Sequence, residues 1–245
     1  IQMFGFYFQF CFAVSFSYLD QLYTRIGGKQ VVFEKFLCCH FYICSELATE
    51  DAEHTKLLLC SLKCGGIYLV QYTKTVFLKN NKECLLRNAV GTDAEEIHKI
   101  FNLTHAQTDF LCTYPDENLF DTEEERYFLL EKERSANEIE ICAVVGGHIV
   151  GTAGIEAVGK KDKVKHRAEF GISIEKGFWG IGIGYALTVA CVECAKAAGY
   201  MQLELNVVSE NRRAISLYEG IGFREYGRNP KGFRSRKTGW QEIVL

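Results

Sequence analysis

Three glycines within six residues, at the junction of an expected strand and an expected helix, constrain this chain more than any other feature. The segment from Trp179 to Gly184 reads WGIGIG. Glycine lets a backbone turn sharply and approach a ligand without a clash from Cβ. The free N–H groups and the positive dipole at the start of the next helix suit a phosphate or pyrophosphate. A tight connection that binds no ligand is the alternative interpretation.

Two common nucleotide-binding motifs do not fit this turn. No Lys-Ser/Thr pair follows Gly184, so the segment is not a Walker loop. The spacing of the glycines also differs from that of the GxGxxG dinucleotide fingerprint. If the turn binds a phosphate-bearing ligand, it belongs to another class of site.

The pattern around the turn predicts an α/β fold with a mixed sheet, because strands and helices alternate and hairpins come first. Gly146 and Gly147 separate two apolar runs, which is a hairpin signal. Thr122 and Glu125 form a capping-box pattern at a helix start. The expected strands are 84–88, 139–145, 149–156, 166–174, 201–208, 223–226 and 240–245. The expected helices begin after Asp93, run from 122 to about 134, and cover 185–198 and 211–220.

The charge balance excludes one large class of partner. The chain has 28 basic and 31 acidic residues, a formal net charge of −3. No general basic field therefore exists to hold nucleic acid or an anionic membrane. We expect a cytoplasmic protein with no nucleic-acid partner.

The composition divides the chain before Leu78. Residues 1–77 contain 16 of the 32 aromatic residues and six of the eleven cysteines, but only six basic and six acidic residues. Residues 78–245 have the charge content and length of one soluble domain. We therefore predict an atypical segment, 1–77, and a domain, 78–245. The chain starts with Ile1, and we expect Leu78 to be an alternative translation start, with 1–77 read from noncoding DNA.

Other interpretations of the first segment have less support. Residues 1–19 are uncharged and barely long enough to cross a bilayer, and their Phe residues repeat with the period of a strand. A membrane association is therefore not favoured. A cluster of thiols and one imidazole lacks the regular spacing of a zinc site, and we predict no metal. Its members are Cys38, Cys39, His40, Cys44, Cys60 and Cys64.

Residues 169–222 resemble the GNAT superfamily of acyl-CoA-dependent N-acetyltransferases at several independent points. The first is the glycine turn at 179–184, which lies where that family has its acyl-CoA loop. The second is the strand that follows and ends near Asn206, and the third is the run from Asn211 to Tyr218 with Gly222 and Phe223 beyond. Trp179 stands where the family most often has Gln or Arg. The resemblance covers almost all of 84–245.

The resemblance implies a mostly antiparallel sheet, flanked by helices, whose splayed central strands bind acetyl-CoA. The backbone of Ile172 and Ile174 is then expected to pair with the pantetheine amides, as an added strand would. Asn211 is expected to contact the cofactor, although it is also a candidate N-cap. The expected phosphate-binding backbone comprises Gly180, Ile181, Gly182, Ile183, Gly184 and Tyr185.

The resemblance also implies two catalytic roles. Tyr218 is expected to protonate the departing thiolate of CoA; a purely structural place in the core is the alternative. Glu169, on the strand before the turn, is the candidate base that takes a proton from the amine, directly or through water. Glu204 is the rival, and either carboxylate could instead pair with a nearby cation.

The predicted function is transfer of the acetyl group of acetyl-CoA to a primary amine, by direct attack through a tetrahedral intermediate. A noncatalytic acyl-CoA-binding or regulatory module is one alternative, and a membrane-tethered acetyltransferase is another. The acceptor is a small amine or a protein N-terminus, and a homodimer stays open. Acidic residues at 109–121 would favour a cationic acceptor, whereas basic residues at 228–237 would favour one that bears a carboxylate or phosphate.

Overall fold

The computed structural model describes residues 22–26, 29–33, 62–64 and 67–245, and it divides into the units Ile1–Leu47 and Ala48–Leu245. In the first unit, β1 (Leu22–Ile26) pairs with β2 (Lys29–Phe33) in antiparallel orientation. The second unit begins with the short antiparallel pair β3 (Leu62–Cys64) and β4 (Ile67–Leu69). The interpretations of residues 1–19, and of the thiol cluster apart from the backbone of Cys64, lie outside the described residues.

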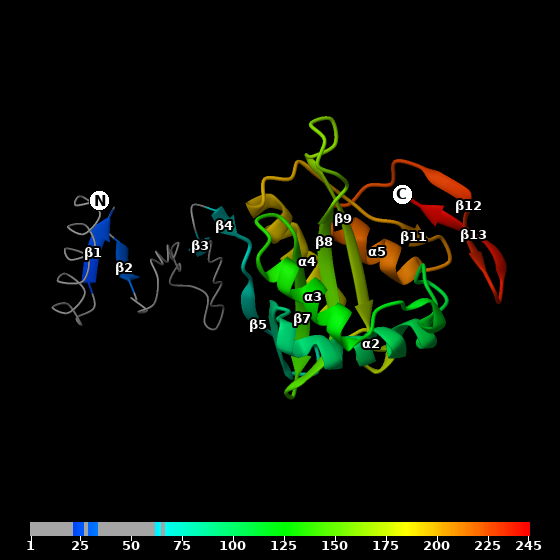
Figure 1. Cartoon of the computed structure of the whole chain (residues 1–245), viewed down its shortest axis with the longest axis horizontal. Helices are drawn as coiled ribbons and strands as arrows, with labels where there is room; N and C mark the ends of the chain where they lie inside the picture. Colours follow the sequence, from blue (N-terminus) through cyan, green and yellow to red (C-terminus); the bar gives the residue numbers. More distant parts are fainter. Residues whose placement is uncertain (1–21, 27–28, 34–61, 65–66) are drawn as a thin grey trace. The chain divides into compact units, whose positions relative to one another are not determined.

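A six-stranded sheet in the order β10-β9-β8-β7-β6-β5 forms the centre of the second unit (Figure 1). Every neighbouring pair is antiparallel except β9 and β10, which are parallel. The sheet therefore confirms the predicted mixed, mostly antiparallel fold. Its strands are β5 (Thr73–Phe77), β6 (Glu83–Asn88), β7 (Ile139–Val145), β8 (His148–Ala157), β9 (Arg167–Ile174) and β10 (Gln202–Glu204).

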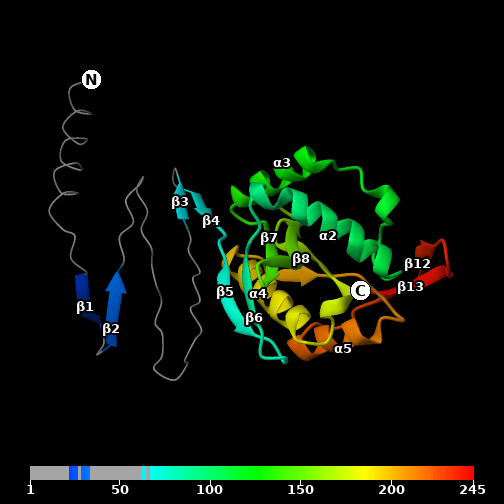
Figure 2. The same cartoon turned by 90° about the horizontal axis from the view of Figure 1, so that it is seen from below.

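Helices cover both faces of this sheet, as Figure 2 shows. On one face, α4 (Ile183–Ala197) packs against the odd-numbered residues of β7, including Ile139 and Ile141. On the other face, α2 (Ala94–Gln107) and α3 (Thr122–Glu133) cover Cys142. Because strand side chains alternate between faces, the apolar run 141–145 of β7 fills both core layers.

The local signals of the hairpin and the helix starts are largely confirmed. Gly146 and Gly147 have φ angles of 60° and 86°, which a two-residue hairpin turn requires. The predicted capping box at the start of α3 is wrong by one residue. Asp121 is the N-cap and Glu124 completes the box, whereas Glu125 is buried against the sheet side of the helix.

The expected strand 201–208 is in fact two strands that belong to different sheets. After β10 the chain leaves the six-stranded sheet, and β11 (Val207–Val208) joins a second sheet in the order β11-β13-β12. The break explains how β9 and β10 diverge after only three paired residues.

The C-terminal elements complete the second sheet. Here α5 (Arg212–Ile221) follows β11, and β12 (Arg228–Ser235) pairs with β13 (Gly239–Val244). The predicted strand 223–226 is wrong, because those residues form a connection and the strand starts at Arg228.

The sheet also extends to the N-terminal side of Leu78. Strand β5 pairs with β6 over its whole length, and Val70 and Tyr72 are buried in the core with 7% and 3% of their surface exposed. Asn88 accepts a hydrogen bond from the Tyr72 N–H at 2.6 Å and donates one to the Val70 carbonyl at 3.2 Å. The division before Leu78 stays a prediction, and the folded core crosses it.

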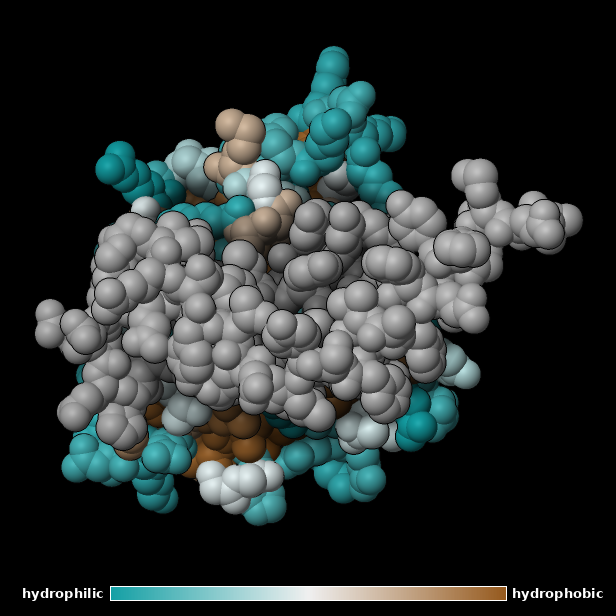
Figure 3. Space-filling model, turned by 90° about the vertical axis from the view of Figure 1, so that its left-hand side faces the viewer, coloured by the Kyte–Doolittle hydropathy of each residue, from teal (hydrophilic) through white to brown (hydrophobic). Residues whose placement is uncertain are grey.

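Hydrophilic residues cover much of the described surface that is visible in Figure 3, and a hydrophobic area lies in the lower part of the view. In the part of the chain that the structure describes, no helix combines the length and the apolar character of a membrane span.

Candidate active site

The glycine turn has the sharp backbone turn that its sequence predicts. A short 3-10 turn (Lys176–Phe178) leads from β9 into it, and α4 starts at Ile183 with Gly182 as N-cap. Gly180 and Gly182 have φ angles of 87° and 110°, a region that residues with a Cβ rarely adopt. Since Gly182 has no side chain to cap the helix, the first N–H groups of α4 stay free for a ligand.

Trp179 fixes the turn to the end of β9. Its indole N–H donates a hydrogen bond of 2.7 Å to the carbonyl of Ile174. This carbonyl was expected to accept a hydrogen bond from a pantetheine amide. Because Trp179 already bonds to it, only the N–H of Ile174 remains to bond to the pantetheine. The Trp at this position thus has a structural function, which its departure from the usual Gln or Arg did not reveal.

The free edge of β9 lies where β10 has diverged. The Glu175 N–H and the Arg167 carbonyl both bond to β8 and its extension. Because the backbone groups of alternate strand residues point to opposite sides, those of Ile172 and Ile174 point away from β8. The pairing of β10 with β9 ends at Glu169, so Ile172 has no strand partner on this side. The expected divergence of the two strands is present, and we call the edge of β9 that it leaves unpaired the opening.

Helix α5 closes this opening on one side. Its N-cap Asn211 accepts a hydrogen bond from the Ala214 N–H at 3.3 Å, which is the structural role weighed for it. A Cβ on Gly184 would lie 3.3 Å from the Leu217 side chain, and one on Gly180 would lie 2.6 Å from the Arg213 guanidinium. Sequence reasoning missed Arg213. Its signal was a basic residue five positions before Tyr218, in a motif already assigned to the cofactor.

Tyr218 lies beside the same opening. Its ring packs edge-on against Phe170 of β9, with ring centroids 6.1 Å apart, and against Phe223 at 5.9 Å. Burial raises the pKa of Tyr218 to about 12, so the phenol stays protonated at neutral pH. Its hydroxyl has no hydrogen-bond partner among the described residues. The hydroxyl is therefore available to a ligand.

The two candidate bases differ in their environment. Glu204 is buried, and both of its carboxylate oxygens accept bonds from the Arg167 guanidinium, one at 2.6 Å. These bonds lower the pKa of Glu204. Glu169 is exposed and makes no ion pair within the described ranges. Because Glu169 and Phe170 are adjacent in β9, they face opposite sides of the sheet, so Glu169 and Tyr218 flank the opening from opposite faces.

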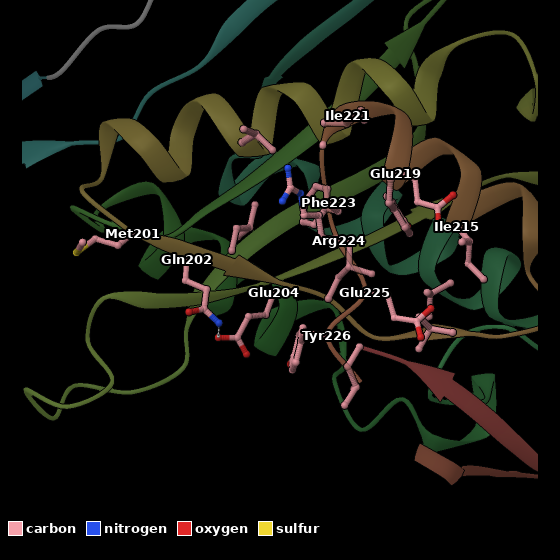
Figure 4. Close-up of a pocket in the computed structure, with 18 of the residues that line it drawn as sticks. Met201, Gln202, Glu204, Ile215, Glu219, Ile221, Phe223, Arg224, Glu225 and Tyr226 are labelled. Carbon is pink, nitrogen blue, oxygen red and sulfur yellow. Dashed lines mark hydrogen bonds between the residues drawn. The ribbon is translucent and has the colours of Figure 1, made fainter. Parts of the chain in front are cut away.

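A cavity of about 570 Å³ adjoins the site at the outer side of β10 (Figure 4). It lies between β10, the end of α5 and the connection 222–226, and its labelled residues include Gln202, Glu204 and Phe223. Tyr218 also lines it, whereas neither β9 nor the glycine turn contributes to its described lining. Tyr218 thus stands between this cavity and the opening at β9.

Most of the charged side chains on the two expected acceptor segments are paired with each other or with neutral donors. Arg236 bonds to Asp116 at 2.8 Å and to Glu117 at 3.0 Å. Asp109 accepts hydrogen bonds from Ser235 at 2.6 Å and from Tyr114 at 3.2 Å. These contacts join the loop after α2 to the β12–β13 hairpin, and they lower the pKa of Asp109. No group of three metal-ligating side chains occurs among the residues described.

Comparison with known proteins decides the family. Residues 97–223, more than half of the chain, match the model of the Acetyltransferase (GNAT) family. The chain belongs to the GNAT family. Comparison with curated protein sequences gave no match.

Solved GNAT structures share the fold. The GNAT acetyltransferase from Streptococcus pneumoniae is 30% identical over 66% of this chain and 96% of its own, with a TM-score of 0.63. YncA from Salmonella typhimurium, whose structure contains acetyl-CoA, is 19% identical over 66% of this chain and 90% of its own, with a TM-score of 0.58. A ribosomal-protein-alanine N-acetyltransferase from Brucella melitensis is 23% identical over 65% and 95%, with a TM-score of 0.57.

Proposed function

We propose that this GNAT protein transfers the acetyl group of acetyl-CoA to a primary amine. The observation that carries the proposal is the unpaired backbone of Ile172, which lies between a phosphate-suited turn and a free tyrosine hydroxyl. A pantetheine arm carries amides that can bond to such an edge as a strand would. A structure with the same fold, that of YncA, holds acetyl-CoA.

The cofactor-binding groups that we propose lie along this path. The Ile172 backbone and the Ile174 N–H meet the pantetheine amides. The phosphates meet the N–H groups of Gly180, Ile181, Gly182, Ile183, Gly184 and Tyr185. The Arg213 guanidinium beside Gly180 adds a positive charge to this anion site. Asn211 stabilises the start of α5, which holds Arg213 and Tyr218 in place.

The reaction that these groups support is direct acetyl transfer. Glu169 takes one proton from the acceptor ammonium, directly or through water, and the free amine attacks the thioester carbonyl. As the carbon–sulfur bond breaks, the thiolate takes the proton of Tyr218, and Tyr218 regains one from the nitrogen of the product. The dry surroundings that raise the pKa of Tyr218 also raise that of the thiolate, because desolvation disfavours both anions.

The test is the release of CoA thiol from acetyl-CoA in a panel of primary amines, with the wild type and Tyr218→Phe. We expect kcat of the variant to fall about 10²-fold or more, as loss of a general acid does, while CoA affinity is kept. The phenyl ring keeps the packing on Phe170 and Phe223, so the fold is preserved. Equal turnover by the two proteins would contradict the role of Tyr218.

A further inference from the structure

A tight turn between β5 and β6 touches the glycine turn from a distant part of the sequence. The Lys79 N–H donates a hydrogen bond of 2.9 Å to the carbonyl of Ile181. The turn is anchored in the core: Leu78 is 4% exposed, and its carbonyl accepts a bond from the Asn81 N–H at 2.9 Å. The contact therefore fastens the glycine turn to the central sheet.

This contact sets the direction of one peptide group. A trans peptide is planar, so the Ile181 carbonyl and the Gly182 N–H point in opposite directions. With the carbonyl held toward Lys79, the Gly182 N–H points away from the β5–β6 turn. Without the contact this peptide would rotate more easily, because its rotation changes φ of Gly182, and glycine populates positive and negative φ almost equally.

The Gly182 N–H is a useful donor in that orientation. It has no hydrogen-bond partner in the ranges described, and it continues the row of free N–H groups at the start of α4. In the opposite orientation the Ile181 carbonyl would face the phosphates and repel them. One hydrogen bond from outside the loop thus decides whether the 181–182 peptide presents a donor or an acceptor to an anion.

We propose that the backbone amide of Lys79 is a positioning group for the cofactor, which holds the 181–182 peptide with its N–H toward the pyrophosphate. This inference rests on the proposed use of acetyl-CoA. It gives the β5–β6 turn a function in cofactor binding that is independent of the Lys79 side chain.

The test replaces Lys79 with proline, which removes this N–H and puts the ring Cδ toward the Ile181 carbonyl, so the contact is lost. Lys79 is the second residue of a four-residue β-turn closed by the Asn81 N–H, and proline is favoured there. Lys79→Ala keeps the amide and is the matched control. By calorimetric titration of CoA, we expect Lys79→Pro to bind about tenfold more weakly than Lys79→Ala, the effect of one misplaced donor to a charged group.

S-acetylpantetheine, which lacks the pyrophosphate, separates this role from general damage to the fold. With this donor, kcat/KM of Lys79→Pro should equal that of Lys79→Ala. Equal CoA affinity of the two variants, or an equal loss with both donors, would overturn the positioning role. A wild type that does not bind CoA would instead overturn the proposed function itself.

A second pair of variants covers the case in which Lys79→Pro does not fold. Asn81 has a φ of 60°, which glycine adopts freely and a β-branched residue does not. We expect Asn81→Val, which strains the turn, to weaken CoA binding, and Asn81→Gly to keep it. Equal binding by these two variants also contradicts the proposal.

Discussion

Single side chains within the sheet show how strongly the fold changes the chemistry of a residue. Glu140 on β7 is directly opposite Gly154 in the sheet, and its carboxylate occupies the space above that glycine, where a Cβ would lie 2.1 Å from it. Burial raises the pKa of Glu140 to about 7, although Thr152 bonds to it. Lys132 and Glu125 of α3 and Glu156 of β8 also act on this carboxylate, but Lys132 bonds to Glu138 and Glu156.

Glu140 makes the stability of the fold depend on pH. Its pKa is higher in the folded protein than in the unfolded chain, so its favourable contribution is complete below about pH 4.5 and is lost as the pH rises to about 7. We expect the melting temperature of the wild type to fall by several degrees, relative to that of Glu140→Gln, between pH 5 and pH 8. Parallel melting curves of the two proteins across this range would contradict the assignment.

The environments of Glu169 and Glu204 favour Glu169 as the catalytic base. Glu204 is already bonded to Arg167, whereas Glu169 is exposed on the face opposite Tyr218. We expect Glu169→Gln to lower kcat/KM for the amine by 10²-fold or more, with little change in CoA affinity. Initial-rate assays at saturating acetyl-CoA, with the amine concentration varied, measure this kcat/KM. An unchanged kcat/KM would remove Glu169 from the mechanism.

At the scale of elements, the sequence predicts those turns that depend on a local residue signal. The Gly146-Gly147 hairpin and the glycine turn need positive φ angles that few other residues adopt, and both are confirmed. The break between β10 and β11 has no such signal, because residues 203–208 are mostly apolar and read as one strand. Only pairing with β9 on one side and β13 on the other separates them.

In the candidate site, too, features with a local sequence signal were predictable and features that depend on tertiary contacts were not. The family motif placed Tyr218 and the glycine turn together, and the structure brings them to one opening beside β9. The Trp179–Ile174 bond and the Lys79–Ile181 bond were not predictable, because each depends on the tertiary position of a single backbone carbonyl. The role of Arg213 likewise appears only where α5 meets Gly180.

Strand β5 gives a prediction about the start of the folded domain. A chain of residues 78–245 would lack β5 together with the buried Val70 and Tyr72. Burial of two such side chains contributes about 3–6 kcal/mol, so we expect this chain to be less stable than residues 67–245 by a similar free energy of unfolding. Urea denaturation of the two chains measures this difference in the free energy of unfolding. Equal stability would support a domain that starts at Leu78.

At the scale of the whole molecule, the described residues offer two neighbouring places for a ligand, with Tyr218 between them. One is the opening between β9 and β10, which ends at the glycine turn; the other is the cavity at the outer side of β10. Only the first combines unpaired strand backbone with free N–H groups at a helix start. The proposed acetyl transfer requires the cofactor to occupy that opening.

A crystal structure of the protein with acetyl-CoA tests this claim most directly. We expect pantetheine amides hydrogen-bonded to the Ile172 backbone, phosphates on the Gly182 N–H, and the thioester sulfur next to the Tyr218 hydroxyl. Acetyl-CoA bound instead in the cavity along Met201–Leu205, with the edge of β9 empty, would contradict it.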